Sequence, residues 1–413
     1  MRLPTVSQFK NEMSTMSNQF NRIQDLQTQV TTGKKLQHSS DDPLLADRIN
    51  TVSDFVQTVK GYQLNTTLAE SRVSLASSNM KQSVNEVDRV RELIQRAQND
   101  TLSNTDRRNI ALELQGHLDN LLEVANARDS NGEYIFSGIN IHGSAYVNQG
   151  GSYVYRGGQE VTRIAIGVQN TVPFNDSGFE IFGNIKSGNG LFTLSADNIN
   201  NTGNSVVTTG GALQNVAYVP DNYTITFVTN SAGNMAWQVT GQVAGQVIPE
   251  PPQMAPADAP EFQANTEIAF KGVNLQFSGQ PQTGDVFFVE QSKTQNIFDT
   301  LQGVINTLNT PATSAQEKAH LHQSLVEQSS SFRQVANHLN GFVTELANRQ
   351  TFIDDQSNFS SNILMEQKIL LGKLSDVDIT EVISDLTQRL TTLEITQQSY
   401  LKIQDTLNRL LKA

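Results

Sequence analysis

The six histidines are the side chains of this 413-residue chain with the widest chemical range, because histidine serves both as a general base and as a metal ligand. They are His38, His117, His142, His320, His322 and His338. Only His320 and His322 are neighbours, and two residues apart on a helix they point away from each other. Helical metal pairs use spacings of three or four residues. The pattern therefore favours a solvated helix face over a metal site.

Two adjacent carboxylates, Asp41 and Asp42, are a second candidate for acid and base chemistry. They stand directly before Pro43, which suits the first turn of a helix. Carboxylate oxygens at that place accept hydrogen bonds from the unpaired amides and meet the positive end of the helix dipole. We therefore predict a capping role for them. Gly33 and Lys34 lack the spacing and the second glycine of a phosphate-binding loop.

The composition narrows the function further. The chain contains no cysteine, which excludes disulfides, thiol catalysis and cysteine-containing zinc sites. Its net charge is -12, and acidic residues outnumber basic ones between residues 145 and 294, so no surface is expected to follow a nucleic-acid backbone. The apolar fraction of 37% is low for a compact enzyme. We predict a protein that is not an enzyme and needs no cofactor.

Both ends of the chain carry an apolar stripe at helical spacing. The N-terminal stripe falls in a predicted helix over residues 5–31, slips at Leu26 and consists of Val6, Phe9, Met13, Met16, Phe20 and Ile23. The C-terminal stripe begins at Ile379 and continues through Val382, Leu386, Leu390, Leu393, Tyr400, Ile403, Leu407 and Leu410. Two such helices can pair with each other. Burial of their stripes is too small to offset the backbone entropy of ordering them, so neighbouring subunits are expected to complete the core.

Between the two ends, helical periodicity gives way to strand periodicity and then returns. Helices are predicted over residues 43–99 and 105–128, and again from about 295 to 308 and from 312 to 363. Short β runs separated by Gly, Asn and Pro clusters occupy the middle, and Pro-rich residues 249–260 read as a surface loop. The fold class is therefore α+β and multidomain: paired N- and C-terminal arms form an antiparallel helical bundle or coiled coil around a central β-rich domain.

The expected domain boundaries follow these changes in periodicity. They are a tip helix and turn over residues 1–42, a helical arm over 43–144, a β-rich outer domain over 145–294, a returning arm over 295–369 and a C-terminal tip helix over 370–413. No stretch is apolar enough for a secretory signal or a membrane span, so no membrane insertion is expected.

Several short motifs occur in an order that resembles the flagellin superfamily and, within it, the hook-associated protein 3 family. The motif residues are Gly33, Lys34, Ser40, Asp41, Asp42 and Pro43 near the N-terminus, and Asn126, Gly132, Tyr134, Phe136, Ser137 and Gly138 after the second predicted arm helix. Further similar segments lie at 272–301 and 374–379. The resemblance covers both helical arms, and residues 190–265 rest on similarity of fold alone. It implies a structural role for the twelve motif residues.

The resemblance also implies a function. Members of this family are adaptors at the junction between the flagellar hook and the filament, so the expected partners are further copies of the chain, hook-associated protein 1, flagellin and a cytoplasmic export chaperone. The chain would be made in the cytoplasm, exported through the flagellar type III apparatus without a cleaved signal, and placed in the extracellular flagellum.

Three alternatives remain open at this level. The first is a flagellin that forms the filament itself. The second is a secreted protein that binds host membranes, although the two apolar stripes lack the basic flanks of membrane-surface helices. The third is an enzyme in the middle domain, which would need a catalytic constellation that the sequence does not display.

Overall fold

The computed structural model describes residues 3–209, 217–265 and 267–412; for residues 3–9, 12, 403 and 406–412 it describes the backbone only. The chain forms two compact units. The first, here called the terminal unit, comprises Met1–Thr66, Ile166–Gln169 and Asp355–Ala413, and the second, the central unit, comprises Thr67–Ala165 and Asn170–Asp354. Two long helices, α2 (Pro43–Ala97) and α5 (Ala315–Ser375), each contribute residues to both units.

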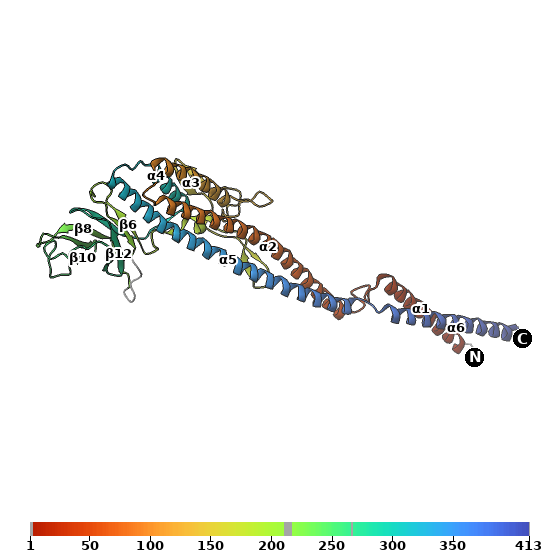
Figure 1. Cartoon of the computed structure of the whole chain (residues 1–413). Helices are drawn as coiled ribbons and strands as arrows, with labels where there is room; N and C mark the ends of the chain where they lie inside the picture. The colour runs from red at the N-terminus through yellow and green to blue at the C-terminus, as the bar shows by residue number, and fades with distance from the viewer. Residues whose placement is uncertain (1–2, 210–216, 266, 413) are drawn as a thin grey trace. The chain divides into compact units, whose positions relative to one another are not determined.

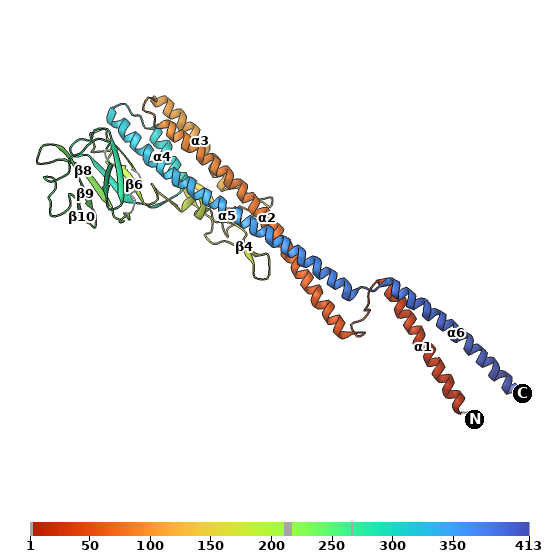
Figure 2. The same ribbon diagram turned by 60° about the horizontal axis from the view of Figure 1, so that its bottom comes forward.

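In the terminal unit, α1 (Leu3–Thr32) and α6 (Ile379–Lys412) form an antiparallel pair. Figure 2 shows the two helices close together at their inner ends and diverging toward the chain termini, which lie at the same end of the pair. The adjoining parts of α2 and α5 pack through a small apolar cluster of Val52, Val56, Val59, Ile363 and Leu364. Most of the apolar burial in this unit therefore comes from narrow helix contacts.

The predicted end of the long helix that starts near residue 312 is wrong: we expected it near residue 363, and α5 continues to Ser375. Residues 364–375 contain good helix formers and no proline, and Gly372 by itself does not end the helix. The break falls instead at 376–378, so the predicted tip segment 370–413 includes the last turns of α5 as well as α6.

In the central unit, α3 (Asn104–Ala125) and α4 (Ile297–Asn309) pack against each other. Each begins at a side-chain cap: Ser103 and Asp106 form a reciprocal capping box at α3, and Asn296 accepts a hydrogen bond from the amide of Asp299 at α4. The helical core is formed by apolar side chains that are almost fully buried, namely Met80, Val87, Ile94, Leu114, Leu118, Leu301, Val304, Phe332 and Leu339.

The strands of the central unit are short and antiparallel (Figure 1). They are β1 (Tyr146–Gln149), β2 (Ser152–Tyr155), β3 (Arg163–Ala165), β4 (Thr171–Pro173), β5 (Ile185–Lys186), β6 (Phe192–Ala196), β7 (Val206–Thr209), β8 (Tyr223–Thr229), β9 (Met235–Gly241), β10 (Gly245–Ile248), β11 (Glu267–Phe270), β12 (Val273–Ser278), β13 (Val286–Gln291) and β14 (Thr294–Gln295). Three two-stranded pairs, β1-β2, β3-β4 and β5-β14, lie in the described residues alongside two larger sheets.

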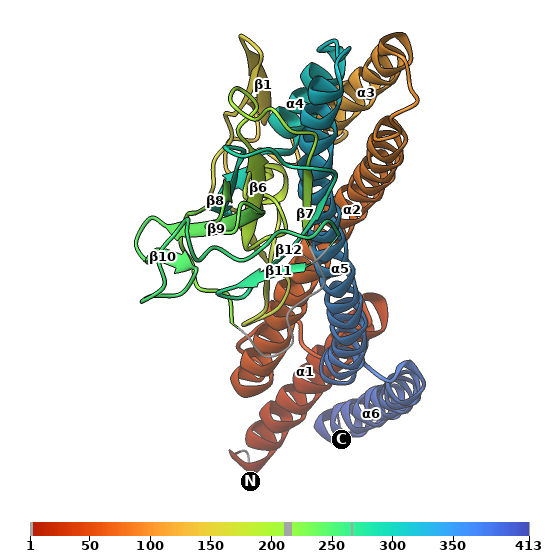
Figure 3. The same ribbon diagram turned by 60° about the vertical axis from the view of Figure 1, so that its left-hand side comes forward.

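The two larger sheets, with strand orders β10-β9-β8-β13-β6 and β11-β12-β7, share one core. Along β8, Tyr223, Ile225 and Phe227 are buried and alternate with half-buried threonines, as expected for a strand with one face inward. We call residues Phe192–Gln291 of these sheets the β-rich body. Figure 3 shows its strands gathered on one side of α5.

Candidate assembly surface

The tip helices are positioned by a clasp between the end of α1 and the break before α6. Gly33, with φ +70, ends α1 in a conformation that favours glycine, and its carbonyl accepts a hydrogen bond from the Val377 amide at 3.0 Å. The Lys35 amide donates to the Ser375 carbonyl at 2.8 Å. The Lys34 ammonium lies 2.6 Å from Asp376 Oδ1, and this hydrogen bond lowers the pKa of the Asp376 carboxyl.

The acidic pair after this clasp holds the loop that leads into α2. Asp41 Oδ2 accepts hydrogen bonds from the amides of His38 at 2.9 Å and Gln37 at 3.3 Å. Asp42 Oδ1 accepts from the amide of Leu45 at 3.0 Å, directly after Pro43 opens the helix. Both carboxylates therefore accept hydrogen bonds from backbone amides and hold the turn that leads into α2.

On α1, one edge of the apolar stripe is buried and the other is exposed. Ile23 and Leu26 are 3% and 4% exposed, whereas Phe20 is 54% exposed and Met13, seven residues before it, is also exposed. Met16 is half-buried. Leu26, which we treated as a slip in the pattern, is one of the best buried residues of α1, and its three-residue step from Ile23 is the signal that indicates this.

On α6, the stripe separates into two parallel lines. Val382 is buried, and Leu386, Leu393 and Tyr400 are half-buried; their steps of four, seven and seven place them on the line that faces inward. A second line, consisting of Ile379, Ile383, Leu390 and Leu401, is exposed, with Leu390 at 44%. The side chains of Val6, Phe9, Ile403, Leu407 and Leu410 lie outside the described residues.

We call the exposed set, Met13 and Phe20 of α1 with Ile379, Ile383, Leu390 and Leu401 of α6, the free edge. Ile383 and Leu401 were not among the predicted packing residues. Ile383 follows Ile379 by four residues and Leu401 follows Leu390 by eleven, and both steps return to the same line of the helix. An apolar line of this length on paired helices is a surface that a further helix can cover.

The motif from Asn126 to Gly138 forms a joint between α3 and the first strands. The Asn126 side chain holds the backbone of Tyr146 with two hydrogen bonds of 3.0 Å, one to the carbonyl and one from the amide. Phe136 is fully buried and packs edge-on against Phe182, with ring centroids 5.6 Å apart. Gly138, with φ +56, sits where a Cβ would overlap the carbonyl oxygen of Gly158.

Charged and aromatic side chains tighten the same joint. The Arg72 guanidinium on α2 is paired with Asp129 and, at 2.9 Å, with Glu133. Arg128 lies over the ring of Tyr134, 4.3 Å from its centroid, and the buried Ser137 hydroxyl donates to the Tyr134 carbonyl at 3.4 Å. Gly132, with φ +82, turns the chain between them. The motif residues described here thus make structural contacts. A structural role for the whole set, which includes the exposed Ser40, stays a prediction.

Three of the histidines lie close to three different groups. His117 Nδ1 lies 2.5 Å from Glu86 Oε2, His322 Nδ1 lies 3.8 Å from Asp100, and His338 Nε2 lies 2.7 Å from the Glu180 carbonyl. Within the described ranges, His, Asp and Glu side chains form no group of three that could hold a metal ion. In the same part of the chain, each helix is either too short or too polar to cross a lipid bilayer.

Known proteins resemble this chain in both sequence and fold. The family model for the bacterial flagellin N-terminal helical region matches residues 5–141. The crystal structure of flagellar hook associated protein-3 from Legionella pneumophila is 34% identical, with a TM-score of 0.75, and the match covers 79% of this chain and 98% of that one. The flagellar junction protein FlgL from Legionella pneumophila is 35% identical, with a TM-score of 0.69, over 75% of this chain and 99% of that one.

A curated relative agrees with these structures over a shorter stretch. Flagellar hook-associated protein 3 of Salmonella typhimurium is 32% identical over 187 residues, which is 45% of this chain. The chain spans 58% of the length of that relative, and the same share of the Escherichia coli protein of the same name. Fold and sequence thus point to one family.

Proposed function

We propose a structural role at the junction between flagellar hook and filament for this chain, which belongs to the flagellar hook-associated protein 3 family. In this proposal the chain is an extracellular adaptor without enzymatic activity. It links hook-associated protein 1 to flagellin, and it is made in the cytoplasm, guarded by an export chaperone and secreted without a cleaved signal. Membership of this family supports the proposed location at the junction between hook and filament.

The observation that carries the mechanism is the free edge. Each of its side chains gains about 1.5–3 kcal/mol when a neighbour removes it from water, so the whole edge offers on the order of 10 kcal/mol before the entropy of ordering the helices is subtracted. Among the described side chains of α1 and α6, only Ile23, Leu26 and Val382 are fully buried, and the others on the inward line are half-buried. The helix pair by itself is therefore thinly stabilised, and adjacent subunits complete its core.

This arrangement favours coupled folding and assembly. Helices with a thin core become firmly ordered when their exposed apolar line is covered, and the entropy lost in that ordering offsets part of the free energy gained by burial. A contact between unlike surfaces of successive copies builds a helical layer instead of a closed dimer. The predicted packing residues on the inward line, such as Leu386, hold the helix pair together, and those on the free edge, such as Leu390, contact the neighbour.

The test uses a strain that lacks this chain and is complemented with variants. Leu390→Asp puts a charge on the free edge and should leave hooks without filaments while flagellin appears in the medium. Gln388→Asp is the matched control, because it adds the same charge to an exposed position on the opposite side of α6. Electron microscopy of the cells and detection of flagellin in the medium read out both variants. Filaments of normal number on Leu390→Asp cells would overturn the assignment of the free edge.

Purified protein distinguishes the junction role from the alternative of a filament-forming flagellin. A junction adaptor is expected to stay monomeric, with amides of residues 10–31 and 379–402 exchanging faster than those of α3 and α4 because few side chains protect them. Growth of long filaments from the purified chain alone would favour the flagellin alternative.

A further inference from the structure

A line of polar side chains runs along α5 between residues 316 and 338, on the side toward the β-rich body. We define the α5 polar stripe by residues at steps of three and four: Gln316, His320, Gln323, Glu327, Ser331, Gln334 and His338. A helix face that packs against another layer is normally apolar. Here the apolar positions of α5, such as Leu325 and Phe332, point into the helical core. The attachment of the β-rich body therefore depends on polar contacts.

Five members of the stripe are hydrogen-bonded to the backbone of the segment from η1 (Phe179–Gly183) to β7: two bonds reach the β-rich body itself, and three reach the chain that leads into it. The bonds are Val207 amide to Gln323 Oε1 at 2.7 Å, Gly188 amide to Ser331 Oγ at 3.0 Å, Gln334 Nε2 to the Asn189 carbonyl at 2.8 Å, His338 Nε2 with the Glu180 carbonyl at 2.7 Å, and Gln316 Nε2 to the Asn201 carbonyl. Polar contacts of this kind typify interfaces between domains that can separate.

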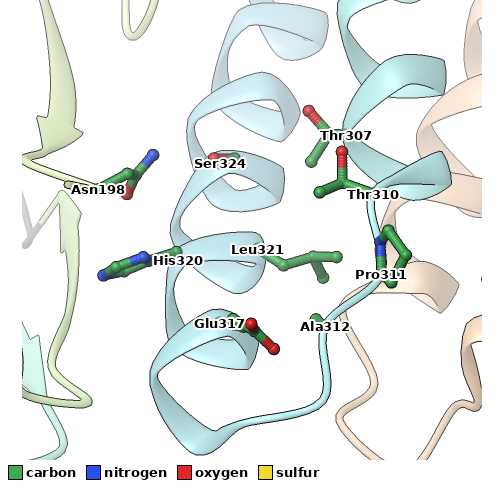
Figure 4. A pocket seen from close by; sticks show the side chains of 9 residues that line it. All are labelled: Asn198, Thr307, Thr310, Pro311, Ala312, Glu317, His320, Leu321 and Ser324. Atoms are coloured by element: carbon green, nitrogen blue, oxygen red, sulfur yellow. The ribbon is translucent and has the colours of Figure 1, made fainter.

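Two members of the stripe make no such bond in the described structure. Figure 4 shows His320 extending from α5 toward the segment that carries Asn198, while Leu321 points the other way, toward the end of α4. The buried Nε2 atom of His320 has no hydrogen-bond partner among the described residues. A cavity of about 290 Å³ opens at this place.

The second is Glu327, which stands at the centre of the stripe. It lines another cavity, of about 300 Å³, together with Phe192 and Leu194 of β6 and Thr208 of β7. In the described residues it takes part in neither a hydrogen bond nor an ion pair. Burial, with a smaller contribution from the nearby charge of Glu290, raises the pKa of the Glu327 carboxyl to about 7.

The charged groups around Glu327 do not neutralise it. Glu290 on β13 is itself paired with Lys293 at 3.2 Å, and Arg333 of α5 lines the same cavity but forms no ion pair with Glu327 in the described structure. The residues that β6 and β7 contribute to the cavity wall are uncharged, and so is Gln98, which follows the end of α2. Elsewhere on the stripe, the titratable groups are His320, near Asp197, and His338.

We propose that the β-rich body is attached to α5 by a releasable dock whose strength is set by the protonation of Glu327. The neutral carboxyl is tolerated in the cavity, whereas the carboxylate has to be desolvated next to Glu290 and so favours separation. The β-rich body can separate without unfolding because it has a core of its own, built from both of its sheets. The dock lies within the central unit, so its release can be tested independently of the junction role.

The direction of the pH effect follows from proton linkage. The docked state keeps the proton up to about pH 7, whereas an unperturbed glutamate releases it near 4.5. Docking is therefore strongest below pH 4.5. It weakens by up to about tenfold per pH unit as the pH rises toward 7, and it changes little above that.

The absence of cysteine makes a distance measurement straightforward. Val243→Cys lies in the exposed turn after β9, and Leu112→Cys lies on the exposed side of α3, so nitroxide labels at both report the position of the β-rich body against the helices. Pulsed electron paramagnetic resonance at pH 5.5 and 8.5 gives the distance distribution. We expect a narrow distribution at pH 5.5 and a broader one at pH 8.5.

Three variants of the labelled chain test whether Glu327 causes the broadening at high pH. Glu327→Gln, which mimics the neutral carboxyl, should keep the narrow distribution at both pH values, and Glu366→Gln, an exposed carboxyl on α5, should behave like the parent. Glu290→Gln removes the repulsion between the two carboxylates, so the Glu327 carboxylate is less unfavourable in the cavity. The distance distribution of this variant should therefore broaden at a higher pH than that of the parent. A parent distribution that is the same at both pH values, or a Glu327→Gln chain that broadens like the parent, would refute the dock.

Discussion

Arg349 of α5 and Asp176, in the segment before η1, form a buried ion pair with Nη1 2.9 Å from Oδ1 and side chains 8% and 9% exposed. Arg349 lies about three helical turns beyond His338, the last residue of the α5 polar stripe. The pair joins the same helix to the joint around Gly138, whose amide donates to the Asp176 carbonyl at 3.1 Å. Loss of one partner from such a buried ion pair lowers the stability of the fold strongly, because the other charge stays buried.

Arg349→Met should destabilise the central unit by about 3–5 kcal/mol, because the buried Asp176 carboxylate loses the cation to which it is hydrogen-bonded and keeps only the more distant charge of Arg72. Urea denaturation followed by circular dichroism measures the loss. The double variant Arg349→Met with Asp176→Leu should recover much of it, since no isolated charge remains. Glu345→Gln is the control: its side chain is 60% exposed and its pairing with Arg349 is worth less than about 1 kcal/mol. Equal losses in the single and double variants would contradict this account.

Two glycines of the motif should respond differently to alanine. Gly132 and Gly138 both have positive φ, at +82 and +56, so each substitution strains the backbone by about 1–2 kcal/mol. At Gly132 the new methyl group meets open space, whereas at Gly138 it overlaps the Gly158 carbonyl. Gly138→Ala should therefore lower the thermal midpoint at least twice as far as Gly132→Ala. Similar shifts for both would show that the close approach to Gly158 does not matter.

Glu317 should make the start of α5 sensitive to acid. Its Oε2 accepts hydrogen bonds from the amides of Ser314 at 2.9 Å and Thr313 at 2.6 Å, and these bonds lower the pKa of the carboxyl to about 2. Because the folded-state pKa is depressed, the stabilisation is complete above pH 4.5 and is lost as the pH falls through about 2. Thermal midpoints measured between pH 2 and 6 should fall less steeply for Glu317→Gln than for the parent. Glu366→Gln should follow the parent; parallel curves for all three would exclude this contribution.

Much of the architecture could be predicted from local signals. The Ser103 and Asp106 capping box, the Asn126–Gly138 motif and the alternation at Tyr223, Ile225 and Phe227 are each readable within a few residues, and the predicted α+β class with long terminal helices is confirmed. The short strands β1, β4, β5, β6, β7, β10 and β14 escaped prediction, because two to five residues give too little periodicity. The end of α5 was misplaced because residues 364–375 carry no strong stop signal.

The sequence by itself determined that the chain's ends are amphipathic helices, that no cysteine chemistry is available, and that the motifs belong to one family, since periodicity and residue type are local properties. Only the tertiary structure decided that Val382 is buried while Leu390 is exposed, and that the polar line through Gln323 and Glu327 faces a β-rich layer. The physical reason is geometric. A repeat of three and four residues specifies an arc around one helix, but the packing of distant segments decides which part of that arc is covered.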